Sequence, residues 1–139
     1  MITLDQYVGI HAKSKDWTAQ RKLNAIELLK RSNALVLAAQ ADGVMFKINP
    51  KTDSLISGET FGGFRPQSCP IGAPNSNHKE GKGVDVWDFD GSIDAWCNSP
   101  RGLLACEKCG IWLEDQGHTP GWVHMQSIPP KSGKRVFLP

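Results

Sequence analysis

The sequence predicts an α+β fold in which N-terminal helices pack on a small, mainly antiparallel sheet. Two observations predict it: apolar residues recur at helical spacing in the first third of the chain, and short alternating segments separated by turn residues follow. The 139 residues, of which 40% are hydrophobic, are enough for one packed domain. We therefore expect a single domain, 1–139, made of a helical segment (1–43), a central region that carries the functional residues (44–128) and a tail (129–139).

Two helices are expected in the helical segment. Thr3 or Asp5 can cap a short helix that runs through Ile10, and Thr18 can cap a longer one. Apolar residues in the longer helix recur at spacings of three and four, which predicts one buried face, and Gly43 is expected to end it. The apolar residues of this stripe are Leu23, Ala25, Ile26, Leu28, Leu29, Val36 and Leu37.

Short extended segments dominate the rest of the chain, because β-branched and aromatic residues alternate between clusters of turn residues. The segments expected to be extended are 44–48, 55–64, 84–87, 111–114 and 122–127. One or two short helices are expected within 93–109, and a polar loop, 129–135, precedes a last apolar stretch. Residues 65–83 form a loop rich in Gly, Pro, Ser and Asn, and a loop of this length inside a compact domain is usually functional.

Charge and hydropathy exclude several classes of protein. The 16 basic and 14 acidic side chains give a net charge of +2, so there is no basic footprint for nucleic acid. No run of about 18 apolar residues is present, so no membrane span is expected. The N-terminus lacks a basic segment followed by an apolar one, so we expect no secretory signal and synthesis as a cytoplasmic protein. Nothing in the sequence indicates an oligomeric state.

The cysteines are expected to stay reduced, because the chain is long enough for a core and shows no export signal. They are Cys69, Cys97, Cys106 and Cys109. Cys106 and Cys109 have the spacing of a zinc knuckle, but one pair is only half a zinc site, so we expect them at the end of a helix. A nucleic-acid-binding knuckle built on this pair is disfavoured by the charge balance.

Strand alternation gathers polar side chains on one face of the expected sheet. If the strands share a sheet, Asp85, His124 and Glu114 point away from their aliphatic neighbours and lie on the same side, and His78 enters from the preceding loop. Two imidazoles and one carboxylate form a ligand set for a single zinc ion that leaves the fourth position open for water. A zinc ion lowers the pKa of that water towards about 7 and polarises a carbonyl.

Structural alternatives stay open for these residues. A single histidine in a strand is more often a hydrogen-bonded structural residue than a ligand, and Asp85 can pair with Lys82 instead. From alternation alone, a metal site and an ordinary polar sheet face are both compatible with the sequence.

Three motifs resemble a known zinc signature. Ser76-x-His78 followed by Gly81 and Asp85, with Trp122-x-His124 downstream, is similar to the signature of the D-alanyl-D-alanine metallopeptidases. This group includes zinc D,D-carboxypeptidases, vancomycin-resistance dipeptidases and phage endolysin peptidases, and shares its metal-site fold with the hedgehog signalling domain. The match covers about residues 55–128, and phage-encoded members resemble it most. The resemblance implies one Zn²⁺ held by His78, Asp85 and His124.

The resemblance also implies roles for residues around the metal. Arg65 matches an arginine that holds a substrate carboxylate or polarises the scissile carbonyl, tasks that suit a guanidinium fork. Pro66 biases Arg65 to an extended backbone, which we expect to aim it outwards. Ser76 and Trp122 are expected to contact substrate. The alternatives are a surface arginine in a turn for Arg65 and a turn residue for Ser76.

One position departs from the family pattern. These peptidases usually carry Glu or Asp three residues before the last histidine, as general base, and here that residue is Gly121. Glu114 is the first replacement candidate because alternation puts it on the polar face, followed by Asp115 and His118 in the next loop. A positioned general base contributes about 10²–10⁴-fold to rate, so its absence separates a hydrolase from a protein that only binds.

The function expected from the resemblance is a zinc metallopeptidase that hydrolyses peptidoglycan stem peptides. The specificity would be that of a D,D-carboxypeptidase or of an L-Ala-D-Glu endopeptidase. The setting would be cell wall degradation by a phage lysin-like protein, released to the host wall during lysis or carried on the virion. The alternative is a non-catalytic, zinc-stabilised module that binds a cell-wall peptide or a protein.

Overall fold

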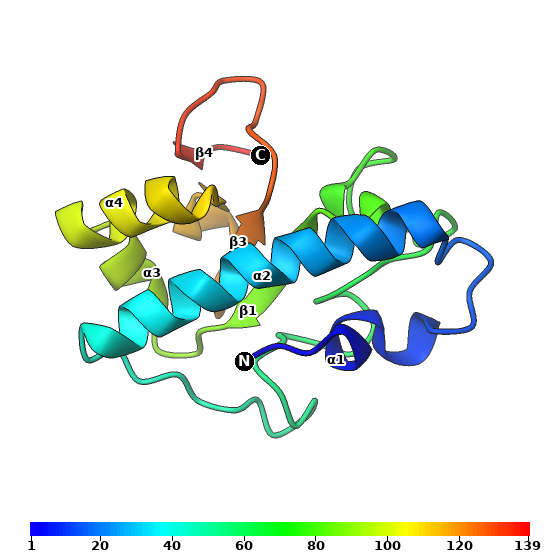
Figure 1. Ribbon diagram of the computed structural model, residues 1–139, viewed down its shortest axis with the longest axis horizontal. Helices are drawn as coiled ribbons and strands as arrows, with labels where there is room; N and C mark the ends of the chain where they lie inside the picture. The colour runs from blue at the N-terminus through cyan, green and yellow to red at the C-terminus, as the bar shows by residue number, and fades with distance from the viewer.

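A mixed four-stranded sheet with a long helix across one side organises the computed structural model, which describes residues 1–139 (Figure 1). The strands β1 (Gly83–Trp87), β2 (Trp112–Glu114), β3 (Trp122–Gln126) and β4 (Val136–Phe137) lie in the order β1-β3-β2-β4. β3 is antiparallel to both β1 and β2, whereas β4 is parallel to β2. The α+β class is as predicted, and the parallel β4 makes the sheet mixed.

The two N-terminal helices begin where the sequence predicts. α1 (Leu4–Val8) has a capping box on Thr3, and α2 (Ala19–Ala41) begins after Thr18, whose side chain accepts from the Arg21 backbone N–H. α1 ends before the expected residue and continues as a 3-10 turn, η1 (Gly9–His11). Gly43, with a φ of +89°, follows the end of α2, as expected.

The buried face of α2 differs from the predicted stripe. Leu23, Ile26 and Leu37 are 61%, 48% and 54% exposed, so the prediction that they are buried is wrong. The helix carries more apolar residues than one face can hold, and the face centred on small residues is the one that meets the sheet. The buried residues are Ala25, Leu28, Leu29, Ser32, Leu35, Val36 and Ala39.

Two of the predicted extended segments form no strand of the sheet. Residues 44–48 form no strand, and Met45 is 75% exposed. Residues 55–64 make only an isolated bridge, Ile56 to Val86, although their backbone also bonds to that of β1. Glycines explain the irregular path, because Gly63 approaches the Tyr7 carbonyl so closely that a Cβ would lie 1.9 Å from its oxygen. The segment covers the free edge of β1 without continuing the sheet.

The expected helices in 93–109 are α3 (Ser92–Cys97) and α4 (Pro100–Cys109), and two short 3-10 helices, η2 (Asn77–Glu80) and η3 (Gln116–His118), lie in loops. All cysteines are free. Cys106 and Cys109 occupy the last turn of α4, as expected for the end of a helix. None of the helices is both long and apolar enough to cross a bilayer.

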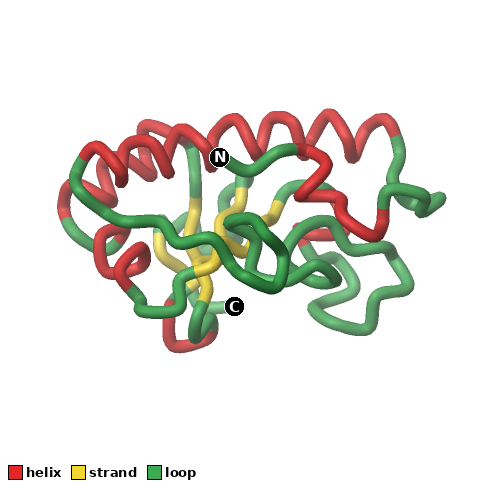
Figure 2. Tube along the Cα trace, turned by 90° about the horizontal axis from the view of Figure 1, so that it is seen from below, coloured by secondary structure: helices red, strands yellow, loops and turns green.

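The aliphatic face of the sheet forms the centre of the core, as alternation predicts. Val84, Val86, Leu113, Val123 and Met125 are at most 1% exposed and share one cluster with the buried residues of α1 and α2. Figure 2 shows α2 running along one side of the strands. The other face of the sheet is therefore free to carry polar chemistry.

Substitution of Gly102 tests the contact between α3 and α4. A Cβ at Gly102 would lie 1.9 Å from the Trp96 carbonyl oxygen, so Gly102→Ala forces the helices apart. We expect a loss of about 1–3 kcal/mol in the free energy of unfolding, despite the better helix propensity of alanine. The measurement is denaturant unfolding, with Gly58→Ala, which has no atom within 4 Å of its Cβ, as the control. Equal stability of the two variants would contradict this packing.

Candidate metal centre

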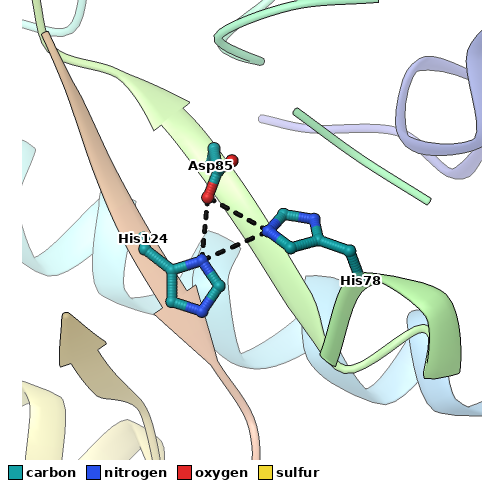
Figure 3. A group of neighbouring side chains, drawn as sticks. All are labelled: His78, Asp85 and His124. Carbon is teal, nitrogen blue, oxygen red and sulfur yellow. Dashed lines mark hydrogen bonds and ion pairs between the residues drawn. The ribbon is translucent and has the colours of Figure 1, made fainter. Parts of the chain in front are cut away.

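His78, Asp85 and His124 bring three ligand atoms together on the polar face of the sheet (Figure 3). Asp85 Oδ1 lies 2.8 Å from His124 Nδ1 and 3.2 Å from His78 Nε2, and the two nitrogens are 3.2 Å apart. Tetrahedral bonds of about 2.0–2.1 Å give ligand–ligand edges of about 3.3 Å. The three atoms therefore form a triangle of the size that one small metal ion requires.

Each ligand comes from a different element, and local structure explains its position. Asp85 on β1 is the direct cross-strand partner of His124 on β3, so the sheet register itself joins them. His78 lies on η2, and Gly81, with a φ of +73°, turns the chain from η2 into β1. A Cβ on Gly81 would lie 2.5 Å from the Arg21 carbonyl oxygen, so this turn requires glycine.

Hydrogen bonds on the side away from the triangle leave one atom each of His78 and Asp85 free to bind a metal ion. The Gly63 carbonyl oxygen, which can only accept, lies 2.7 Å from His78 Nδ1, so Nδ1 carries a proton and neutral His78 has its lone pair on Nε2. Arg65 Nη2 donates to Asp85 Oδ2 at 3.0 Å, which leaves Oδ1 facing the histidines. Metal ligands in proteins are usually oriented by outer partners of this kind.

The three side chains are all at least nine-tenths buried, and their pKa values move in different directions in the protein without metal. Burial lowers the pKa of His78. Burial alone would raise the pKa of Asp85, but the charges of the two histidines and their hydrogen bonds outweigh it and lower the pKa. Burial also opposes protonation of His124, yet its hydrogen bond to Asp85 raises the pKa. Of the three ligands, His124 is thus the one whose pKa shift favours the protonated form.

A cavity of about 530 Å³ opens over the triangle. Besides the three ligands, its walls include five of the other residues expected at the site: Arg65, Ser76, Glu114, His118 and Trp122. Of the expected set, only Asp115 does not line it. The Asp115 carboxylate accepts from the Gly117 backbone N–H at 2.9 Å and caps η3.

Arg65 is buried against Asp85 instead of pointing outwards. Its side chain is 10% exposed, and its Nε donates to the Phe61 carbonyl oxygen at 2.6 Å. The expectation of an outward arginine is wrong, because the carboxylate of Asp85 attracts the guanidinium inwards. The alternative pairing of Asp85 with Lys82 is also wrong, since Arg65 and the histidines occupy both oxygens of Asp85.

Two candidates for a general base remain inside the cavity, Glu114 and His118. Burial raises the pKa of Glu114, the nearby charge of His124 lowers it, and that of Asp85 raises it again, with a net increase. The His118 side chain is 48% exposed at the end of η3. Gly121 has a φ of +90°, a conformation that a residue with a side chain rarely adopts.

Sequence reasoning missed the outer partners around the two histidines. The Gly63 partner is a backbone carbonyl, which the sequence does not distinguish from any other. Asn77 and Gln126, which also line the cavity, carry no charge and so were not considered as site residues. Gln126 could have been predicted, because it lies two residues after His124 on the same strand and therefore on the same face of the sheet.

Comparison with known proteins identified no matching family model, no matching curated protein and no matching solved structure. The resemblance to the D-alanyl-D-alanine metallopeptidases therefore stands on the three sequence motifs. What the structure contributes independently is a buried group, His78, Asp85 and His124, that can hold a metal ion. Its donor set of two imidazole nitrogens and one carboxylate oxygen fits zinc.

The affinity for zinc is expected to fall as the pH falls. Zinc must displace the proton of His124, whose pKa is raised, whereas His78 and Asp85, whose pKa values are lowered, are already deprotonated near neutral pH. Below the pKa of His124, the affinity should drop about tenfold per pH unit, with one proton released on binding. Chelator competition between about pH 5 and 8, with calorimetry in two buffers, measures both quantities. A pH-independent affinity would contradict the assignment.

Proposed function

We propose that this protein is a zinc-dependent peptidase that hydrolyses stem peptides of peptidoglycan. The observation that supports it most is the buried triangle of His78, Asp85 and His124 at the base of an open cavity. Three protein ligands leave one tetrahedral position for water or substrate, which is the arrangement of catalytic rather than structural zinc sites. The class of substrate is proposed from the motif resemblance.

When bound, the zinc ion supplies a water of lowered pKa and a Lewis acid for a carbonyl oxygen. The protein supplies the proton transfer. The carboxylate of Glu114 accepts a proton from the attacking water and delivers it to the leaving amine, and its raised pKa suits both steps. His118, which also lines the cavity, is the second candidate for this role.

Arg65 and Ser76 hold the substrate in this proposal. Arg65 Nε and Nη2 bond within the protein, whereas Nη1 has no partner there. A Cβ on Gly72 would lie 3.0 Å from Arg65 Nη1 and 3.4 Å from Ser76 Oγ, so both atoms border the same small space. A guanidinium nitrogen and a hydroxyl suit a peptide carboxylate. We place the carboxylate of the stem peptide there.

A non-catalytic module that binds such a peptide is the second candidate. One observation favours it: Gly121 stands where the family carries its base, and its φ of +90° disfavours a carboxylate side chain at that position. Such a module would keep the metal ligands and the Arg65 contact but would produce no cleavage. In the cell, we place either form of the protein at the bacterial wall, as a lysin-like protein of a phage.

Substitution of a ligand tests the metal dependence. In His124→Ala the triangle loses its Nδ1 corner, so zinc content and peptidase activity should both be lost. The measurements are the metal content of the purified protein and the release of D-alanine or peptides from wall fragments, followed by mass spectrometry. Activity that survives in His124→Ala would rule out the mechanism.

Three substitutions test which residue acts as the general base. Glu114→Gln should lower kcat about 10²–10⁴-fold while zinc stays bound, because the amide cannot accept the proton. Asp115→Asn changes the neighbouring residue in the same way but lies outside the cavity, so it should leave kcat unchanged. His118→Asn completes the series, and a loss confined to it would move the role to His118. Zinc-loaded wild type that binds the peptide without cutting it would instead support the non-catalytic module.

A further inference from the structure

Gln126 lies beside the metal centre and contacts three different residues through one amide. It is the last residue of β3, two positions after His124 and on the same face, and it is 3% exposed. Its Nε2 donates to the Ile128 carbonyl oxygen at 2.8 Å. Its Oε1 lies 2.8 Å from Asn77 Nδ2 and 3.3 Å from His124 Nε2.

These contacts orient the amide of Gln126. A carbonyl oxygen only accepts hydrogen bonds, so the side of the Gln126 amide that faces Ile128 must be the NH₂ group. The oxygen then faces the other way and accepts from Asn77 and from His124. A flipped amide would place two donors, Gln126 Nε2 and Asn77 Nδ2, against each other unless Asn77 flipped as well.

The orientation of the amide also determines the tautomer of His124. Because Gln126 Oε1 accepts, His124 Nε2 donates to it, and once a metal ion displaces the proton that Nδ1 donates to Asp85 Oδ1, the lone pair of the neutral ring is on Nδ1. Nδ1 is the atom that faces Asp85 Oδ1 and His78 Nε2. Gln126 therefore does for His124 what the Gly63 carbonyl does for His78.

We propose that Gln126 is a positioning residue of the metal centre: held by Asn77 and Ile128, it keeps His124 in the tautomer that presents Nδ1 to the metal ion. The proposal rests on the metal centre of the proposed function. Asn77 directly precedes His78, so the same amide also joins the segment that carries His78 to the strand that carries His124. Outer partners of ligating histidines typically contribute 10–100-fold to metal affinity.

The test compares Gln126→Met, which keeps the size of the side chain without the amide, with Gln126→Glu, which keeps an acceptor oxygen for His124. Zinc affinity is measured by chelator competition, and the protonated ring nitrogen of His124 is identified by ¹⁵N NMR of the zinc-loaded protein. We expect about 10–100-fold weaker binding and a mixed tautomer in Gln126→Met. Gln126→Glu should recover most of the affinity. Gln40→Met, on the exposed side of α2, is the control for the substitution itself.

Asn77→Ala is the second variant, for use if Gln126→Met does not fold. It leaves the Gln126 amide in place but removes its donor partner, so zinc should bind more weakly than to the wild type. Wild-type affinity and an unchanged Nε2–H tautomer in these variants would overturn the role of Gln126 while leaving the metal centre intact. A wild-type protein that binds no zinc would overturn the metal centre and this role together.

Discussion

Asp85 and His124 face each other across the pairing of β1 and β3, and the rest of the site is arranged around that contact. A slip of one residue in this register would turn the ligand on the slipped strand towards the core and bring one of its aliphatic neighbours to the polar face. The aliphatic residues between them prevent such a slip, because Val84, Val86, Val123 and Met125 bury the other face against the helices. The register that packs the core is thus the same register that brings the two ligands together.

In the buried triangle of His78, Asp85 and His124, the lone pairs of the three ligand atoms point towards one another. With its outer bond to Gly63, neutral His78 directs an electron pair at Asp85, and neutral His124 does the same. Such an arrangement is costly in a buried site unless a proton or a cation lies between the atoms. In the metal-free protein, the proton on His124 serves this purpose, and a metal ion would replace it. Metal binding is therefore coupled to the stability of the fold.

Much of the site was predictable because strand alternation is a strong local signal. Alternation placed Asp85, His124 and Glu114 on one face, and the position of His78 in the loop before the strand of Asp85 added the third ligand. Arg65 was misplaced because local backbone preference says nothing about a distant carboxylate that attracts it. The strand expected at 44–48 is absent although its residues are mostly apolar, and the extended stretch expected at 55–64 follows an irregular path because its backbone makes close contacts at glycine. The prediction of the buried face of α2 was wrong because the helix carries apolar residues on more than one face, and spacing alone does not show which face packs against the sheet.

Zinc K-edge X-ray absorption of the protein loaded with one equivalent of zinc tests the central claim most directly. The structure leads us to expect a coordination shell of nitrogen and oxygen at about 2.0–2.2 Å, with the outer scattering of two imidazole rings and no sulfur. A shell that contains sulfur at about 2.3 Å would place the ion on cysteines. That result would contradict a centre formed by His78, Asp85 and His124.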